Sequence, residues 1–346
     1  MFTTMSEINT NAANADKQSD NSIIESDTHH HNDEGIQMDI APEDTKGKEL
    51  TRLDIISSLV EFFSDSSSDE QKEECNTIIK TYLKQIAQKH VCCENYNILV
   101  LYDNGTLVKS DADRIYNSVT KFNQKKPLIL VLYSGGGIPG SAYLIGKLCI
   151  ESSNGKFVIT VPRMAKSAAT LLCCAANEIH MGSLSELGPI DPQINDLPTL
   201  GLKYSVEHIA ELVKRYPASS DMFAKYLNLS LPVIYLGYYE RVAESAIQYA
   251  EKLLSAHGIP QAASKEIAYN LVYKYKDHGF VIDKSEAEEI FGKAVIKANS
   301  EEYELGNSLY MALSFIYNIS DMLNHGFYYV GSLDSDPVFT QKEKKS

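Results

Sequence analysis

Apolar residues recur along this chain in two distinct patterns. Between residues 50 and 90 they return at helical spacing, first around Leu53 to Val60 and again around Ile78 to Ile86, on either side of a serine- and acid-rich stretch. Residues 97–102, 128–133 and 157–161 form short, largely apolar runs rich in strand-forming residues. We therefore predict two N-terminal helices followed by strands.

Helical patterns separate these strands, and this alternation predicts an α/β fold with a parallel sheet and crossover helices. Strands that are apolar throughout are typical of a sheet covered on both faces. Beyond residue 200 the chain is mostly helical, and we predict helices over residues 205–216, 219–227, 232–256, 261–274, 285–291 and 304–324.

The first 48 residues are rich in Asn, Ser, Asp, Thr and Glu and lack a sustained apolar period, which predicts a disordered arm. The run His29-His30-His31 is better explained as part of a solvated tail than as a metal site, because three adjacent side chains do not easily enter one coordination sphere. We expect a helical extension over residues 49–93, the main domain over 94–331 with a helical C-terminal part, and a flexible tail over 332–346.

Charge and cysteine usage restrict the possible functions. The net charge of -14 argues against nucleic-acid binding, since a phosphate backbone needs a basic face. The six cysteines include two adjacent pairs and show no C-x-x-C spacing, which favours reduced, buried thiols over disulfides or a zinc site. The sequence contains no signal-peptide pattern and no apolar run of membrane-spanning length. We expect a cytoplasmic protein without indicated membrane association.

A glycine triplet, residues 135–137, follows the second predicted strand. Without Cβ atoms this backbone can adopt positive φ and bring its amide hydrogens close to a ligand, as an oxyanion pocket requires. Gly135, Gly137 and Gly140 formally have dinucleotide-binding spacing, but the next strand does not end in the acid that such a site uses. A purely structural turn remains an alternative.

Ser167 follows the third predicted strand and begins a helix of small and apolar residues. One crossover separates it from the triplet, so both should lie at the carboxyl edge of the sheet. A helix N-terminus favours a developing negative charge, but it is equally the ordinary position of a capping serine. The position alone does not decide between the two roles.

Three segments resemble one known family: S-G-G-G at 134–137, A-K-S-A-A-T at 165–170 and G-S-L-S-E-L-G-P-I-D-P-Q at 182–193. They resemble the serine dehydrogenase proteinase family, related to signal peptide peptidase A within the ClpP/crotonase superfamily, and H-G-F-V-I-D at 278–283 resembles a further family segment. The resemblance implies a ClpP-like spiral of parallel βαβ units with additional N-terminal and C-terminal helices. It also implies a homo-oligomeric, ATP-independent serine endopeptidase for peptides or unfolded proteins, with no cofactor and no metal.

The resemblance also assigns roles to positions of the site. Ser167 matches the nucleophile, and Gly136, Gly137 and Ala168 match the oxyanion-hole region. The candidate substrate-binding residues are Lys166, Pro189 and Ile190. Adjacent side chains at a helix start point apart, so Lys166 is a better substrate contact than a proton acceptor for Ser167.

The catalytic base is not fixed by the sequence. Asp191 stands near the position where ClpP-type enzymes have a histidine, which leaves it as a candidate auxiliary residue. The resemblance to enzymes of the signal peptide peptidase A type implies a Ser-Lys pair, and Lys203 matches that lysine in chain order. To act as a base, Lys203 needs a pKa that burial has lowered. His278 is the alternative base, because histidine titrates near neutral pH. We expect His180 and His208 to be structural or exposed.

Two other functions remain open at this point. A catalytically inactive scaffold or peptide-binding oligomer would keep the groove and lack a competent base. Acyl-CoA chemistry of the crotonase type would share the oxyanion loop, but the serine context is closer to the peptidase branch.

Overall fold

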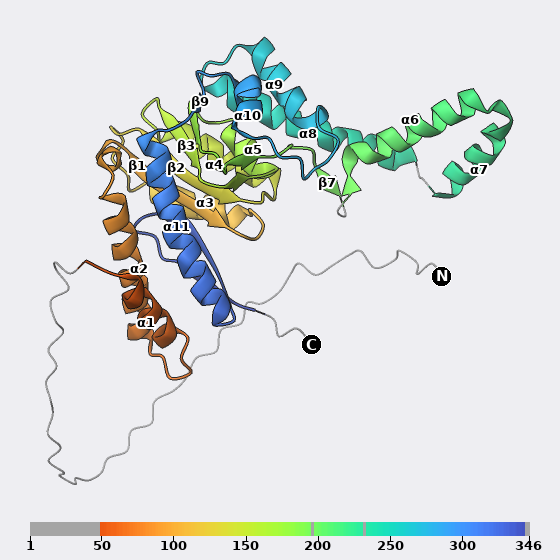
Figure 1. Cartoon of the computed structure of the whole chain (residues 1–346). Coiled ribbons are helices and arrows are strands. Elements are labelled where there is room, and N and C mark those ends of the chain that lie inside the picture. Colours follow the sequence, from red (N-terminus) through yellow and green to blue (C-terminus); the bar gives the residue numbers. More distant parts are fainter. Residues whose placement is uncertain (1–48, 195–196, 231–232, 343–346) are drawn as a thin grey trace, which may run out of the picture. The chain divides into compact units, whose positions relative to one another are not determined.

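The computed structural model describes residues 49–194, 197–230 and 233–342, and the predicted arm over residues 1–48 lies outside this range. The chain divides into a unit of residues 1–48 and a second unit from Glu49 to Ser346. All labelled elements in Figure 1 belong to the second unit.

A mostly parallel sheet forms the centre of this unit, with the strand order β11-β10-β1-β2-β3-β5-β9. Its parallel strands are β1 (Asn97–Asp103), β2 (Leu128–Ser134), β3 (Phe157–Val161), β5 (Glu178–Met181) and β9 (Ile296–Lys297). The edge beside β1 carries two antiparallel strands, β10 (His325–Ser332) and β11 (Val338–Gln341).

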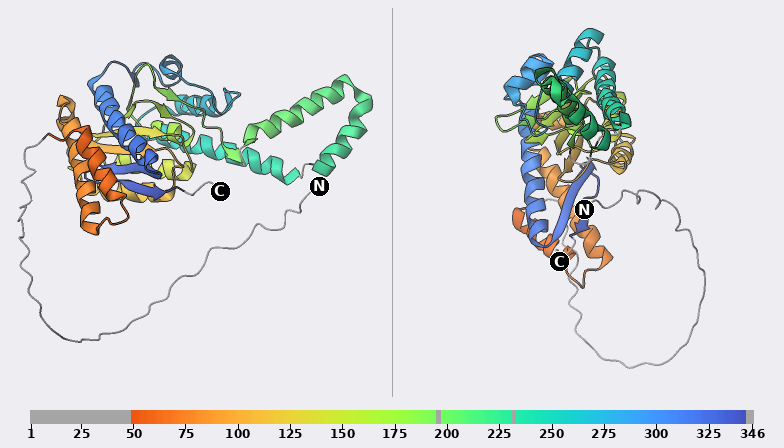
Figure 2. Two further views of the ribbon diagram at one scale, coloured as in Figure 1. Left: turned by 60° about the horizontal axis from the view of Figure 1, so that its bottom comes forward. Right: turned by 90° about the vertical axis from the view of Figure 1, so that its right-hand side faces the viewer.

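Helices cover both faces of the sheet (Figures 1 and 2). Alternate residues of β2 show the division, because Leu130 and Leu132 belong to one hydrophobic core while Ile129 and Val131 belong to the other. The first core contains residues of α3 (Lys109–Val119), α4 (Pro139–Glu151), α5 (Ala168–Cys173), α8 (Val233–Ala256), α9 (Gln261–Tyr273) and α10 (Lys284–Phe291). The second contains residues of α1 (Arg52–Phe62), α2 (Asp69–Ala87) and α11 (Glu301–Met322). This two-sided cover explains why the strands are apolar throughout.

Two helices lie outside these layers in both figures, α6 (Thr199–Arg215) and α7 (Ser220–Ser230). They contact each other, and α6 also contacts α8. Among the described residues no helix combines the length and the apolar character needed to cross a bilayer.

The predicted flexible tail over residues 332–346 is wrong for Ser332, which ends β10, and for residues 338–341, which pair with β10 as strand β11. Phe339 anchors this strand, with its ring centroid 4.7 Å from that of Phe62 and 5.5 Å from that of Phe327. The strand has four residues and packs mainly against aromatic side chains that are far from it in the sequence. Local sequence therefore contains little signal for this strand. Residues 343–346 lie outside the described range.

Short strands at the carboxyl edge of the sheet assemble the site region. β4 (Met164–Ala165) pairs with the end of β2 through Ser134 and Ala165, which places the residues after each strand side by side. β6 (Glu186–Leu187) pairs in turn with β4 and brings the loop that follows it to the same edge. The predicted α/β class with a parallel sheet and crossover helices is confirmed.

Candidate active site

Ser167 adopts a strained backbone conformation, with φ 51° and ψ −117°, immediately before α5. A non-glycine residue rarely adopts a positive φ, and such strain collects at functional sites. The side chain makes no capping hydrogen bond to the helix. Ser167 is therefore not an ordinary N-cap serine, and the sharp turn from strand to helix is the kind that presents a nucleophilic hydroxyl.

Gly136 leaves the space into which this turn fits. Its φ is 105°, and a Cβ atom added there would lie 2.6 Å from the carbonyl oxygen of Lys166 and 2.9 Å from Cβ of Ser167. Its N–H donates a hydrogen bond to Oγ of Ser134 at 3.1 Å. Gly136 thus permits the close approach of two loops, but its own N–H already has an acceptor.

The two other residues expected at the oxyanion hole, Gly137 and Ala168, line one pocket with Ser167. This pocket has a volume of about 590 Å³. Backbone hydrogen bonds of Leu107 to Gly136 and Ile138, both 2.9 Å, fix the loop on either side of Gly137. Within residues 49–194, 197–230 and 233–342, the N–H groups of Gly137 and Ala168 have no hydrogen-bond acceptor. Both can therefore donate to a ligand.

His278 and Asp191 form a hydrogen-bonded pair at the edge of the Ser167 pocket, which His278 lines. Nδ1 of His278 lies 2.8 Å from Oδ1 of Asp191, and Nε2 of Gln193 donates to the other carboxylate oxygen at 3.0 Å. The Asp191 side chain is only 7% exposed, whereas that of His278 is 33% exposed and lines the Ser167 pocket. With Nδ1 directed at the carboxylate, Nε2 is the nitrogen that can accept a proton.

The pKa of His278 is raised above its ordinary value of 6.5, mainly because the hydrogen bond to Asp191 favours the charged ring. Burial acts in the opposite direction, and the negative charges of Asp191 and Asp277 raise the pKa further. Ser167 Oγ makes no hydrogen bond with any described residue, so it can contact a substrate or form a hydrogen bond with the His278 ring.

The segments that carry Asp191 and His278 are fastened to each other and to the Ser167 helix. Leu187 and Ile282 exchange two backbone hydrogen bonds, of 2.9 and 3.0 Å. Oγ1 of Thr170, on α5, accepts a hydrogen bond from the N–H of Gly188 at 3.0 Å. Backbone and buried side-chain bonds thus hold the three candidate catalytic residues at one edge of the sheet.

Lys166 points away from the Ser167 pocket and does not line it. Its Nζ lies 3.0 Å from Oε2 of Glu186 and donates to the carbonyl oxygens of Leu187 and Phe280 at 3.3 and 3.4 Å. The side chain therefore bridges the same two segments that hold Asp191 and His278. Of the other residues expected to bind substrate, Ile190 lines the pocket and Pro189 does not.

Lys203, the candidate lysine base, lies exposed on α6 and is not among the residues that line the Ser167 pocket. His208 is exposed on the same helix. His180 is buried on β5, where Nδ1 lies 2.6 Å from Oγ of Ser300, and burial lowers its pKa. His278 therefore lines the pocket of Ser167, whereas Lys203 does not.

Several residues of the site were not found from the sequence. Gln193 holds the Asp191 carboxylate, and Thr170 holds the loop at Gly188. Val242 and Ala246 of α8, about 75 residues beyond Ser167 in the chain, also line the pocket. The sequence offers His278 as the alternative base, but nothing local to residues 278–283 indicates that this histidine contacts Asp191. In the described chain no cluster of three or more His, Cys, Asp or Glu side chains has the arrangement of a metal site.

Comparison with known proteins tests the resemblance to the serine dehydrogenase proteinase family. Residues 97–214 match the family described as ClpP-like SDH-type serine proteinase. The predicted resemblance is confirmed. The match includes Ser167, the glycine loop and Asp191 and ends before His278. It supports a peptidase role for this segment, which is about a third of the chain.

Two curated relatives each match somewhat more than a quarter of the chain. The uncharacterized protein MJ0137 of Methanocaldococcus jannaschii is 30% identical over 97 residues, or 28% of this chain and 34% of that protein. The uncharacterized protein MJ1495 of the same organism is 27% identical over 92 residues, or 27% of this chain and 31% of that protein. The chain thus spans about a third of the length of these relatives.

A search of solved structures finds the 1510-N membrane-bound stomatin-specific protease, with 15% sequence identity and a TM-score of 0.38 over 59% of this chain and 80% of that chain.

Proposed function

We propose that this protein is an ATP-independent serine endopeptidase that hydrolyses peptide bonds in peptides or unfolded protein segments. The observation that carries the proposal is the shared pocket of Ser167 and His278, in which His278 is held by Asp191 at 2.8 Å. The strained backbone of Ser167 and the family match over residues 97–214 support it independently.

In this proposal His278 is the general base. Its Nε2 takes the proton of Ser167 Oγ while the oxygen attacks the carbonyl carbon of the scissile bond. Asp191 keeps the proton on Nδ1 and stabilises the imidazolium that forms. His278 then gives the proton to the leaving amine, and water releases the acyl group from Ser167 by the same steps in reverse.

The oxyanion of the tetrahedral intermediate would accept hydrogen bonds from the N–H groups of Gly137 and Ala168. Both residues line the pocket, and their N–H groups have no acceptor in the described chain. Ala168 begins α5, so the helix N-terminus favours negative charge at the same place. Removing one such donor typically lowers kcat by about 10²–10³.

The proposal is tested by cleavage of casein and of a fluorogenic peptide without ATP, together with labelling by a fluorophosphonate probe. Ser167→Ala is expected to abolish both cleavage and labelling. Ser183→Ala, at an exposed serine in a neighbouring loop, is the matched control and should keep both. Labelling that survives in Ser167→Ala would overturn the assignment of the nucleophile.

The rival function, a catalytically inactive peptide-binding scaffold, is an outcome of the same experiment. It is supported if the wild-type chain binds peptides but neither cleaves them nor reacts with the probe. A titration with coenzyme A tests the crotonase-type alternative, which requires saturable binding.

We further propose that the protein works as a homo-oligomer. Large apolar side chains are exposed on and beside α7, including Tyr216, Met222, Tyr226 and Leu229. Such a surface is stabilised when a second copy covers it. Light scattering at micromolar concentration should give a multiple of the 38.5 kDa chain mass, and a monomer would contradict the proposal.

A further inference from the structure

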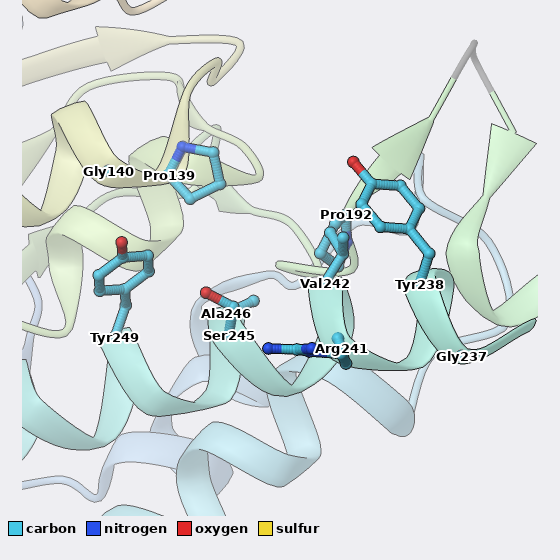
Figure 3. Close-up of a pocket in the computed structure, with 10 residues that line it drawn as sticks. All are labelled: Pro139, Gly140, Pro192, Gly237, Tyr238, Arg241, Val242, Ser245, Ala246 and Tyr249. Carbon is cyan, nitrogen blue, oxygen red and sulfur yellow. The ribbon is translucent and has the colours of Figure 1, made fainter. Parts of the chain in front are cut away.

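A second pocket opens beside the Ser167 pocket and has a volume of about 820 Å³ (Figure 3). Four residues line both pockets: Pro139, Pro192, Val242 and Ala246. The two cavities are therefore neighbours with a common wall, and a peptide bound across Ser167 can extend from one into the other.

One face of α8 forms a wall of the second pocket. Tyr238, Arg241, Val242, Ser245, Ala246 and Tyr249 recur at spacings of three and four residues, which places them on the same side of a helix. Figure 3 shows them along the helix, with Pro139 and Pro192 supplied by other segments. The ring of Tyr249 is fixed by packing on Tyr143, at 4.8 Å between centroids. The wall is thus mostly apolar and partly rigid.

Arg241 is the only formally charged residue among those that line this pocket. Its guanidinium makes no hydrogen bond, ion pair or ring contact with residues 49–194, 197–230 or 233–342, whereas many lysines of the described chain pair with a carboxylate. In a chain with a net charge of -14, carboxylates are abundant and a guanidinium without one is conspicuous. Arg241 is exposed at the rim of mostly apolar walls. Such a cation favours a carboxylate ligand, since guanidinium and carboxylate form paired, charge-assisted hydrogen bonds.

We propose that this pocket is a substrate subsite that takes a peptide segment with an apolar side chain and a carboxylate next to it, and that Arg241 binds the carboxylate. The proposal rests on the proposed peptidase function and adds a substrate class to it. The apolar walls bury the side chain and Arg241 selects the charge. The carboxylate belongs either to an acidic side chain or to the C-terminus of the peptide, and both present the same group to Arg241.

The test uses fluorescein-labelled short peptides that share one leucine-containing sequence. One set has Glu, Gln or Lys next to the leucine, and a second set ends in a free carboxylate or an amide. Binding is measured by fluorescence anisotropy on full-length Ser167→Ala, which cannot turn the peptides over, and kcat/KM is measured on the wild-type chain. We expect the acidic member of at least one set to be preferred by roughly tenfold, the scale of one charge-assisted hydrogen bond.

Arg241→Met removes the guanidinium but keeps an unbranched aliphatic stem, and it should remove the preference. Arg241→Glu should turn the preference toward the Lys peptide. Arg215→Met removes a positive charge from the exposed end of α6, away from the residues that line either pocket, and should leave the preference intact. Peptides that are cleaved without any charge preference, or a preference that survives Arg241→Met, would overturn the subsite. A charge preference in binding to Ser167→Ala, without cleavage by the wild-type chain, would support the subsite and refute the peptidase function.

Discussion

Nδ1 of His278 lies 2.8 Å from Oδ1 of Asp191, although the two residues are 87 positions apart in the chain. The backbone bonds between Leu187 and Ile282 bring their segments together, and Gln193 holds the second carboxylate oxygen. A carboxylate that orients a histidine next to a strained serine is the arrangement that activates a hydroxyl. The His278–Asp191 pair therefore leads to a test of whether His278 or Lys203 is the catalytic base.

The first prediction concerns that base. His278→Gln removes the proton acceptor and should lower kcat/KM by about 10³-fold or more, within the range for loss of a general base. Lys203→Met should leave kcat/KM within about twofold, because Lys203 is exposed on α6 and does not line the pocket. Initial rates on the fluorogenic peptide measure both. The reverse result, a large loss in Lys203→Met alone, would establish a Ser-Lys mechanism.

The second prediction concerns pH. His278 must be neutral to accept a proton, and its hydrogen bond to Asp191 raises its pKa above 6.5. The kcat/KM should therefore rise with pH along a single-proton limb whose midpoint lies above 6.5. Asp191→Asn removes the main cause of the shift, so the residual activity should show a midpoint at lower pH. A limb that does not move in Asp191→Asn would show that another group titrates.

The same pair affects stability with a fixed sign. A raised folded-state pKa means that the folded chain holds the His278 proton more tightly than the unfolded chain does. The contribution is fully present below the unfolded pKa of about 6.5 and is lost as pH rises through the folded pKa. Denaturant unfolding of the wild-type chain and Asp191→Asn across this window should show a difference that shrinks toward high pH.

The sequence predicted the order of elements well because most of them are determined locally. The strands at 97–103, 128–134 and 157–161 are continuous apolar runs, and the helices beyond residue 200 have long amphipathic repeats. The strand pair β10 and β11 was missed, since β10 contains Gly326 and Gly331 and β11 depends on aromatic contacts with α1. Local propensity does not contain such long-range packing.

The candidate site likewise contains residues that local sequence indicates and contacts that depend on the packing of distant segments. Ser167 and the glycine loop could be proposed from the sequence because each lies in a short continuous segment that resembles the family. The association of His278 with Asp191, and the turning of Lys166 toward Glu186, depend on how distant loops dock on β4 and β6. No residue spacing contains that information, so the sequence leaves Lys203 and His278 as alternative bases.

The fourth prediction concerns Gly136. Gly136→Ala forces a side chain into a position with φ 105° and places Cβ against the Lys166 carbonyl and the Ser167 side chain. We expect a loss of about 1–3 kcal/mol in the free energy of unfolding and at least a tenfold slower reaction with the fluorophosphonate probe. Gly155→Ala is the control, because Gly155 also has a positive φ, of 84°, but no atom lies within 4 Å of the added Cβ. It should cost stability without slowing the probe. Equal labelling rates in both variants would remove Gly136 from the site.

The last prediction separates two roles for Lys166. As a substrate contact, which the sequence suggested, Lys166→Met would raise KM and leave kcat nearly unchanged. As a positioning residue that bridges Glu186, Leu187 and Phe280, its loss should lower kcat by about tenfold with little change in KM, because the loop of His278 is held less firmly. We expect the second result and a partial recovery in Lys166→Arg. Lys156→Met removes an ion pair of the same 3.0 Å length, to Glu178, outside the residues that line the pocket. It should change neither constant, so a fall in kcat confined to Lys166→Met would reflect the position of His278 and not the general loss of a salt bridge.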